Sequence, residues 1–167
     1  MTRKLLILTI AGILLLGGIC GVTEAANFPA FSTKTLDGQI VTNSIFSGHK
    51  LTMINFWATW CPPCVGEMPD LGKLGRNMPE DTQLIGLLLD GTTAGEIREA
   101  KSILARANAD FLQILPNGEM NPVLNNITAI PTTIFVDSDG RIVGNPIVGA
   151  RSESSYRSAI ETALKSL

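Results

Sequence analysis

The central motif of this sequence is Asn55-Phe56-Trp57-Ala58-Thr59-Trp60-Cys61-Pro62-Pro63-Cys64. Its two cysteines are separated by two residues, and they follow the apolar run 51–57, which is typical of a buried strand. The residues after them can form a helix. A thiolate at a helix N-terminus faces unpaired N–H groups and the positive end of the helix dipole, and both lower its pKa. Because the thiolate is the nucleophile in disulfide exchange, this arrangement predicts a redox-active pair.

The size and charge of the chain narrow its class. It has 167 residues, of which 13 are basic and 15 acidic, so its net charge is −2. This length fits one domain with a substantial core, and we expect a monomer. Because binding to nucleic acid requires a basic face, the charge balance argues against a nucleic-acid partner.

Residues 1–26 predict export across a membrane. Arg3-Lys4 precedes residues 5–23, which contain no charged side chain, and small residues follow. This order is typical of a secretory signal peptide, but the apolar run is nearly long enough to span a bilayer. A cleaved signal and a retained membrane anchor both stay open, with lipidation of Cys20 as a lesser alternative. In either main case residues 27–167 form a domain outside the cytoplasm, in the periplasm or at the outer face of the cytoplasmic membrane.

The exported part retains two of the three cysteines. A disulfide that closes so short a loop restricts the unfolded chain little, so chemistry explains the pair better than stability does. A structural zinc site needs four ligands, and this part of the chain adds only His49, so we expect no metal site. A module that binds Cu(I) or a client protein through the dithiol, without turnover, remains an alternative.

Strands and helices are predicted to alternate along the chain. A hairpin is expected at 35–41, around Asp37-Gly38. Further strands are expected at 51–57, 84–89, 111–115, 132–136 and 141–148, and helices at 62–77, after a capping box at 93–96, at 119–125 and after Ser152. The last helix should turn Tyr156 and Leu167 inward. This order predicts an α/β sandwich in which helices flank a mixed central sheet.

These features resemble the thioredoxin fold and, more narrowly, the TlpA/ResA group of exported thiol-disulfide oxidoreductases. The resemblance covers roughly residues 28–165. It is carried by the motif 55–64, by Pro69 as the kink proline of the active-site helix, by segment 129–133 as the cis-proline loop, and by segment 111–127 as a strand–helix insertion.

The resemblance implies a role for each site residue. Cys61 matches the exposed, attacking cysteine, and Cys64 matches the resolving cysteine that breaks the mixed disulfide. Pro131 matches the cis-proline, which brings the backbone of Ile130 close to the sulfurs, where it can pair with an extended substrate. Trp60 is expected at the rim of the site. No cofactor is implied beyond the Cys61–Cys64 pair.

Glu67 matches an acidic residue that ResA-like proteins place near the dithiol. Its carboxylate could take a proton from Cys64 as that residue attacks. Plain thioredoxins use a buried Asp of the strand, whereas this strand offers Asn55 and no acid. An acid near a helix start is also favourable through the dipole alone, so a structural role for Glu67 stays open.

The residues between the cysteines indicate the direction of electron flow. Pro62 and Pro63, which adjoin the substrate, have no N–H to offer Cys61, so its thiolate should be weakly stabilised and its disulfide hard to reduce. We therefore expect a reductase of exported proteins, with a disulfide-forming oxidase as the alternative. The resemblance implies clients such as apocytochrome c and a membrane thiol carrier of the CcdA/DsbD kind as electron donor.

Overall fold

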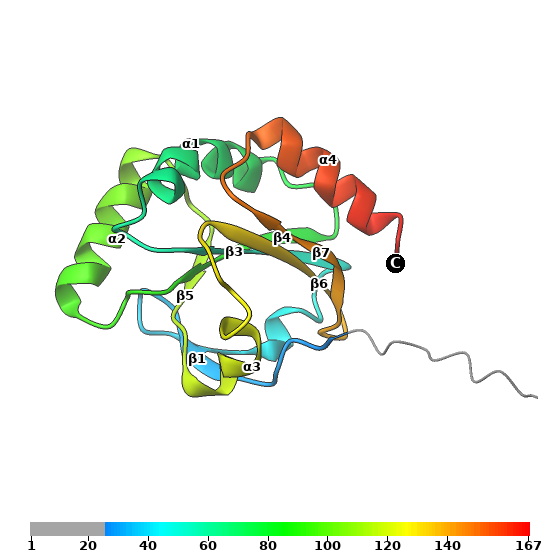
Figure 1. Ribbon diagram of the computed structural model, residues 1–167, viewed down its shortest axis with the longest axis horizontal. Coiled ribbons are helices and arrows are strands. Elements are labelled where there is room, and N and C mark those ends of the chain that lie inside the picture. The colour runs from blue at the N-terminus through cyan, green and yellow to red at the C-terminus, as the bar shows by residue number, and fades with distance from the viewer. Residues whose placement is uncertain (1–25) are drawn as a thin grey trace, which may run out of the picture.

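The computed structural model of the protein describes residues 26–167 (Figure 1). The predicted signal peptide or anchor, residues 1–26, lies outside the described residues apart from Ala26. Within the described range, no helix has both the length and the apolar character needed to cross a membrane.

A five-stranded sheet forms the centre of the fold. Its order is β5-β4-β3-β6-β7, with β5, β4 and β3 parallel and β6 and β7 antiparallel to their neighbours. The strands are β3 (Leu51–Trp57), β4 (Thr82–Leu88), β5 (Leu112–Ile114), β6 (Thr132–Asp137) and β7 (Ile142–Val148). The helices are α1 (Pro62–Arg76), α2 (Ala94–Arg106), α3 (Asn121–Leu124) and α4 (Glu153–Leu164). This mixed sheet with flanking helices confirms the predicted fold class.

The sheet separates two hydrophobic clusters, because successive side chains of a strand point to opposite faces. Met53 and Trp57 of β3 pack with α1, α2 and α4, whereas Ile54 and Phe56 pack with the N-terminal segment and α3. Figure 1 shows α1, α2 and α4 together on one side of the sheet and α3 on the other. The face with three helices is the one that receives the two cysteines.

The predicted N-terminal hairpin and the strand–helix insertion are both present. β1 (Ser32–Lys34) and β2 (Ile40–Thr42) pair antiparallel, and a 3-10 turn, η1 (Asn43–Ile45), follows them. In the insertion, β5 lies at the edge of the sheet, and a second 3-10 turn, η2 (Gly118–Met120), precedes α3. The helix predicted at 119–125 is therefore shorter and divided. Pro122 sits in the first turn of α3, where its missing N–H costs no helical hydrogen bond.

Helix ends follow local sequence signals closely. The capping box at α2 is complete, with Thr93 accepting from the Glu96 N–H and the Glu96 side chain accepting from Thr93. Ser152 caps α4 as predicted. The prediction for Leu167 was wrong: α4 ends at Leu164, and Leu167 lies beyond it with 57% of its surface exposed.

Candidate active site

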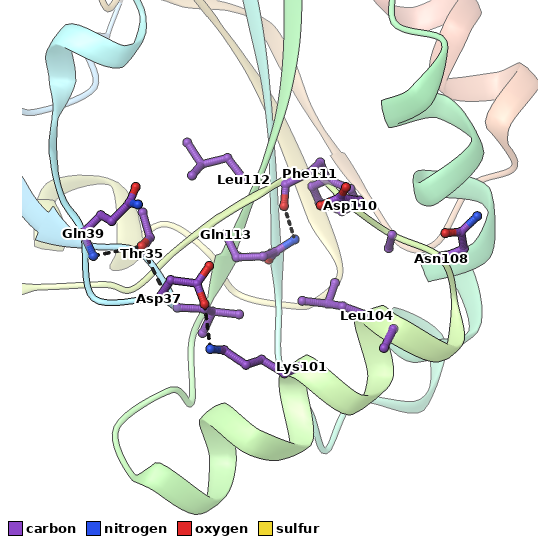
Figure 2. A pocket seen from close by; sticks show the side chains of 13 residues that line it. Thr35, Asp37, Gln39, Lys101, Leu104, Asn108, Asp110, Phe111, Leu112 and Gln113 are labelled. Carbon is purple, nitrogen blue, oxygen red and sulfur yellow. Dashed lines mark hydrogen bonds and ion pairs between the residues drawn. The ribbon is translucent and has the colours of Figure 1, made fainter.

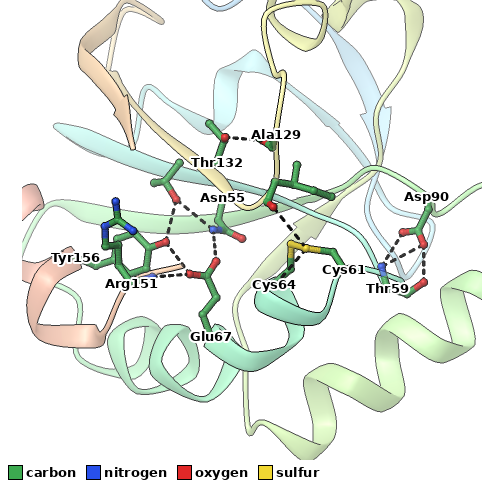
Figure 3. Close-up of a disulfide and its surroundings, with 12 residues drawn as sticks. Asn55, Thr59, Cys61, Cys64, Glu67, Asp90, Ala129, Thr132, Arg151 and Tyr156 are labelled. Atoms are coloured by element: carbon green, nitrogen blue, oxygen red, sulfur yellow. Dashed lines mark hydrogen bonds between the residues drawn. A yellow bond between two sulfur atoms is a disulfide. The ribbon is translucent and has the colours of Figure 1, made fainter. Parts of the chain in front are cut away.

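Cys61 and Cys64 form a disulfide at the junction of β3 and α1 (Figure 3). Cys61 is the N-cap of α1, and its Sγ lies 3.3 Å from the backbone N–H of Cys64, which donates to it. The helix begins with Pro62 and Pro63, whose fixed φ suits the first turn. The predicted placement of the pair at a helix N-terminus is confirmed.

The two cysteines differ slightly in their access to solvent. Cys64 is fully buried, and Cys61 is 3% exposed in this disulfide form. Cys61 is thus less open than the exposed attacking cysteine that the resemblance implied, although it is the more accessible of the two. Two apolar residues that adjoin Cys61 in the sequence are exposed, Trp60 at 70% and Pro62. Trp60 therefore lies at the surface beside Cys61, as expected for a rim residue.

A second loop approaches the disulfide from the start of β6. The peptide bond between Ile130 and Pro131 is cis, as expected, and the carbonyl oxygen of Ile130 lies 3.7 Å from Cys61 Sγ. Ile130 is half-buried and Pro131 is buried. The structure thus brings together the cysteines and the loop that were predicted to meet.

A contact that the sequence analysis missed holds the loop before Cys61. The Thr59 backbone N–H lies 3.2 and 3.1 Å from the two carboxylate oxygens of Asp90, and the Thr59 hydroxyl donates to the same group. Asp90 follows the C-terminal end of β4, which pairs with β3. Asp90 follows β4, and neighbouring parallel strands end at the same edge of a sheet. This position was the signal that could have placed Asp90 beside the active-site loop.

Glu67 is part of a buried polar cluster, which we define as Asn55, Glu67, Thr133 and Tyr156. Asn55 Nδ2 donates to Glu67 Oε1 at 2.9 Å and to Thr133 Oγ1 at 3.1 Å. The Tyr156 hydroxyl donates to Glu67 Oε2 at 2.9 Å, and the backbone N–H of Arg151 reaches the same oxygen at 3.0 Å. β3, α1, β6 and α4 each contribute one side chain to the cluster.

The environment of Glu67 favours its protonated form. Burial raises its pKa above the ordinary value, while hydrogen bonds from the Arg151 backbone, Asn55 and Tyr156 offset part of that rise. Burial also raises the pKa of Tyr156, so this phenol stays neutral and donates. The hydrogen bonds that Glu67 accepts come from this cluster and from Arg151.

The cluster was only partly foreseen. Glu67 and Asn55 were singled out from the sequence, whereas Tyr156 was expected simply as a core residue and Thr133 was noted only within the cis-proline loop. The β3–β6 register pairs Asn55 with Thr133, and α4 brings Tyr156 over them. Long-range pairing of this kind leaves no local signal in the sequence.

Across residues 26–167, no group of three or more His, Cys, Asp or Glu side chains is arranged to hold a metal ion. The chemistry available at the site is that of two sulfurs, a protonatable carboxyl and a backbone acceptor.

A cysteine pair at the start of α1, facing a cis-proline loop on a mixed sheet, defines a thioredoxin-fold thiol-disulfide oxidoreductase. Enzymes of this class use the cysteine pair itself and need no further cofactor. The chain belongs to the Redoxin family, whose model matches residues 23–164.

Known relatives agree with this assignment. The chain is 25% identical over 166 residues to the thiol-disulfide oxidoreductase ResA of Bacillus thuringiensis, covering 92% of this chain and 93% of that protein. It is 29% identical over 143 residues to the thiol:disulfide interchange protein DsbE homolog of Paracoccus denitrificans, covering 81% and 74%. A crystal structure of a thioredoxin-family thiol:disulfide interchange protein from Chlorobium tepidum matches with a TM-score of 0.70 and 25% identity, covering 84% and 97%.

Proposed function

We propose that the protein reduces disulfides of exported proteins by dithiol exchange through Cys61 and Cys64. The observation that carries the direction is the small number of donors facing Cys61. Pro62 and Pro63 have no N–H, and the Val65 N–H donates to the Cys61 carbonyl oxygen at 3.0 Å. Among the described residues, the Cys64 N–H is the one hydrogen-bond donor to Cys61 Sγ. A weakly stabilised thiolate favours the disulfide and gives a low reduction potential.

The reaction begins from the dithiol form. The Cys61 thiolate attacks one sulfur of a client disulfide, which forms a mixed disulfide and releases the first client thiolate. Cys64 then loses its proton and attacks the Cys61 sulfur, releasing the second client thiolate and forming the Cys61–Cys64 disulfide. Two electrons pass to the client, whose thiolates take up protons. Glu67 is the proposed acceptor of the Cys64 proton, a role that its buried position and raised pKa support.

The surface around Cys61 suits a protein client. Trp60 is largely exposed, and Val148, which pairs with Thr132 beside the cis-proline, is 53% exposed. Exposed apolar side chains that gather around a site mark contact with another protein. The Ile130 carbonyl adds a backbone acceptor next to the sulfur, where an extended client segment can pair with it.

The cellular setting follows from the N-terminal sequence. The charged start and the apolar run 5–23 support export, with the domain in the periplasm or at the outer face of the cytoplasmic membrane. A reductant in an oxidising compartment must be recharged, and we propose a membrane thiol carrier of the CcdA/DsbD kind as the donor. Apocytochrome c cysteines are the proposed clients, by resemblance to the ResA group.

The direction is tested by equilibrating the protein with glutathione. We expect the Cys61–Cys64 disulfide to resist millimolar reduced glutathione, and ready reduction would favour the oxidase alternative. A matched pair of variants sharpens the test. An N-cap side chain accepts from the second or third helical N–H. Pro63→Ala adds an N–H at the second helical position, where it can donate to Cys61 Sγ, and should raise the reduction potential by about 30 mV. Pro62→Ala adds an N–H at the first helical position, which does not reach an N-cap side chain, and should change the potential little.

A further inference from the structure

The buried polar cluster contains one acceptor without a donor. Among residues 26–167, two buried side-chain oxygens accept no hydrogen bond, Oδ1 of Asn55 and Oδ1 of Asn117. Asn117 lies in the insertion, where its amide nitrogen binds the Ser32 carbonyl. Asn55 is fully buried beside the disulfide. Because an unpaired buried acceptor is costly, its presence next to reactive groups calls for a functional explanation.

The orientation of the Asn55 amide is fixed by its partners. Its nitrogen donates to the Glu67 carboxylate and to the Thr133 hydroxyl. The Thr133 hydroxyl donates its own proton to the Tyr156 hydroxyl, so its oxygen accepts from the Asn55 nitrogen, and the Asn55 oxygen must point elsewhere. Figure 3 shows this oxygen turned toward the disulfide.

Cys64 lies on that side of Asn55. It precedes Glu67 by three residues on α1, so both side chains lie on the same face of the helix. Met53 and Trp57, which flank Asn55 on the same face of β3, belong to the same buried cluster as Cys64. Asn55 on β3 therefore faces both Glu67 and Cys64 on α1.

We propose that Asn55 is a positioning residue for Cys64: in the dithiol form, its Oδ1 accepts a hydrogen bond from the Cys64 thiol. In the disulfide that sulfur carries no hydrogen, which explains the open acceptor. Reduction leaves Cys64 as a thiol, and its S–H donates to Asn55 Oδ1 until the mixed disulfide on Cys61 has formed. The thiol then gives its proton to a base, and this hydrogen bond is lost. The proposal rests on dithiol exchange but not on its direction or on Glu67 as the base.

The infrared S–H stretch of Cys64 tests this contact directly. In the full chain with Cys20→Ser and Cys61→Ala, Cys64 is the one thiol left. We expect its S–H band at the lower frequency typical of a hydrogen-bonded thiol. A band at the frequency of a free thiol would overturn the proposal even if every further variant failed to fold.

Two variants identify the acceptor. Asn55→Leu keeps a similar volume without an acceptor and should return the S–H band to the free position, with near-ultraviolet circular dichroism confirming native packing. Thr133→Val removes the other acceptor of the Asn55 nitrogen but leaves Oδ1 in place, so the band should not move. A band that shifts in Thr133→Val but not in Asn55→Leu would contradict the assignment.

The pKa of Cys64 supplies a second readout. A hydrogen bond to the neutral thiol raises its pKa, so Asn55→Leu should lower it by about 0.5 to 1 pH unit in an ultraviolet thiolate titration. Asn55 also binds Glu67, and the comparison is therefore repeated with Glu67→Gln in both proteins. If the shift disappeared in that background, Asn55 would act only through Glu67. Ready reduction by glutathione would refute the proposed direction and leave this result unaffected.

Discussion

The two faces of the central sheet bury different kinds of side chain. The face covered by α1, α2 and α4 holds the disulfide together with a buried carboxyl, amide and phenol, those of Glu67, Asn55 and Tyr156. The opposite face holds three phenylalanines, Phe28, Phe31 and Phe46, packed edge to face with ring centroids 5.5 to 6.0 Å apart.

Neighbouring residues of one strand create this difference. Asn55 points to the face covered by α1, α2 and α4, which we call the chemical face, while Ile54 and Phe56 point to the opposite, apolar face. The polar cluster is enclosed, so water does not compete for the hydrogen bonds among its members. Burying these polar groups lowers the free energy of unfolding, and the apolar packing on the other face offsets that loss. Variants on the two faces should therefore affect chemistry and stability separately.

The largest effect is expected at the two sulfurs. Cys61→Ser should abolish turnover of a disulfide substrate, because it removes the nucleophile. Cys64→Ser should instead accumulate mixed disulfides on Cys61, because the resolving thiol is missing.

Mass spectrometry of the trapped adducts measures this difference and identifies the clients. Both variants should fold, since a three-residue loop contributes little to stability through its disulfide. Adducts that appear on Cys64 in Cys61→Ser would reverse the assignment of attacker and resolver.

The apolar face should show the opposite pattern. Phe46 is 1% exposed and contacts both other rings of the phenylalanine group. Phe46→Ala should lower the free energy of unfolding by about 3 to 5 kcal/mol, measured by urea denaturation. The equilibrium of the folded variant with glutathione should match that of the wild type. A shifted equilibrium would mean that the two faces are coupled.

The sequence predicted the elements that depend on local signals. Strand β3 and the capping residues Thr93 and Ser152 lie where apolar runs and caps placed them. Leu167 was misplaced because helical spacing continued past the true end of α4, and periodicity alone does not mark where a helix ends.

The site divides in the same way. Cys61, Cys64 and Pro131 were recognised by motif. Two contacts of the buried polar cluster, Asn55 with Thr133 and Glu67 with Tyr156, depend on how β3 pairs with β6 and how α4 crosses them. They join residues 78 and 89 positions apart. A single sequence carries no local trace of such contacts, so Thr133 and Tyr156 were not linked to Asn55 and Glu67.

A smaller effect separates two glycines of α1. A Cβ on Gly72 would lie 2.7 and 2.9 Å from the backbone carbonyl oxygens of Asn108 and Ala107, which cannot easily move. Gly72→Ala should therefore destabilise the fold by about 1 to 3 kcal/mol. Gly66 is exposed with nothing within 4 Å of its Cβ position, so Gly66→Ala should stabilise the helix by about 0.5 to 1 kcal/mol. Equal shifts in thermal midpoint would contradict this packing.

The buried carboxyl of Glu67, on the chemical face, should make the stability of the fold depend on pH. Burial raises the pKa of Glu67 above its ordinary value of 4.5, so the folded state binds this proton more tightly than the unfolded chain. The contribution of Glu67 to the free energy of unfolding is therefore fully present below that value. It declines as the pH rises through the raised pKa.

Glu67→Gln should remove this decline, which urea denaturation at a series of pH values will measure. Glu161→Gln, an exposed site on α4, controls for the loss of one negative charge and should keep the decline. If both variants behaved alike, the carboxyl of Glu67 would have no special environment, and the distinction between the two faces would be one of packing alone.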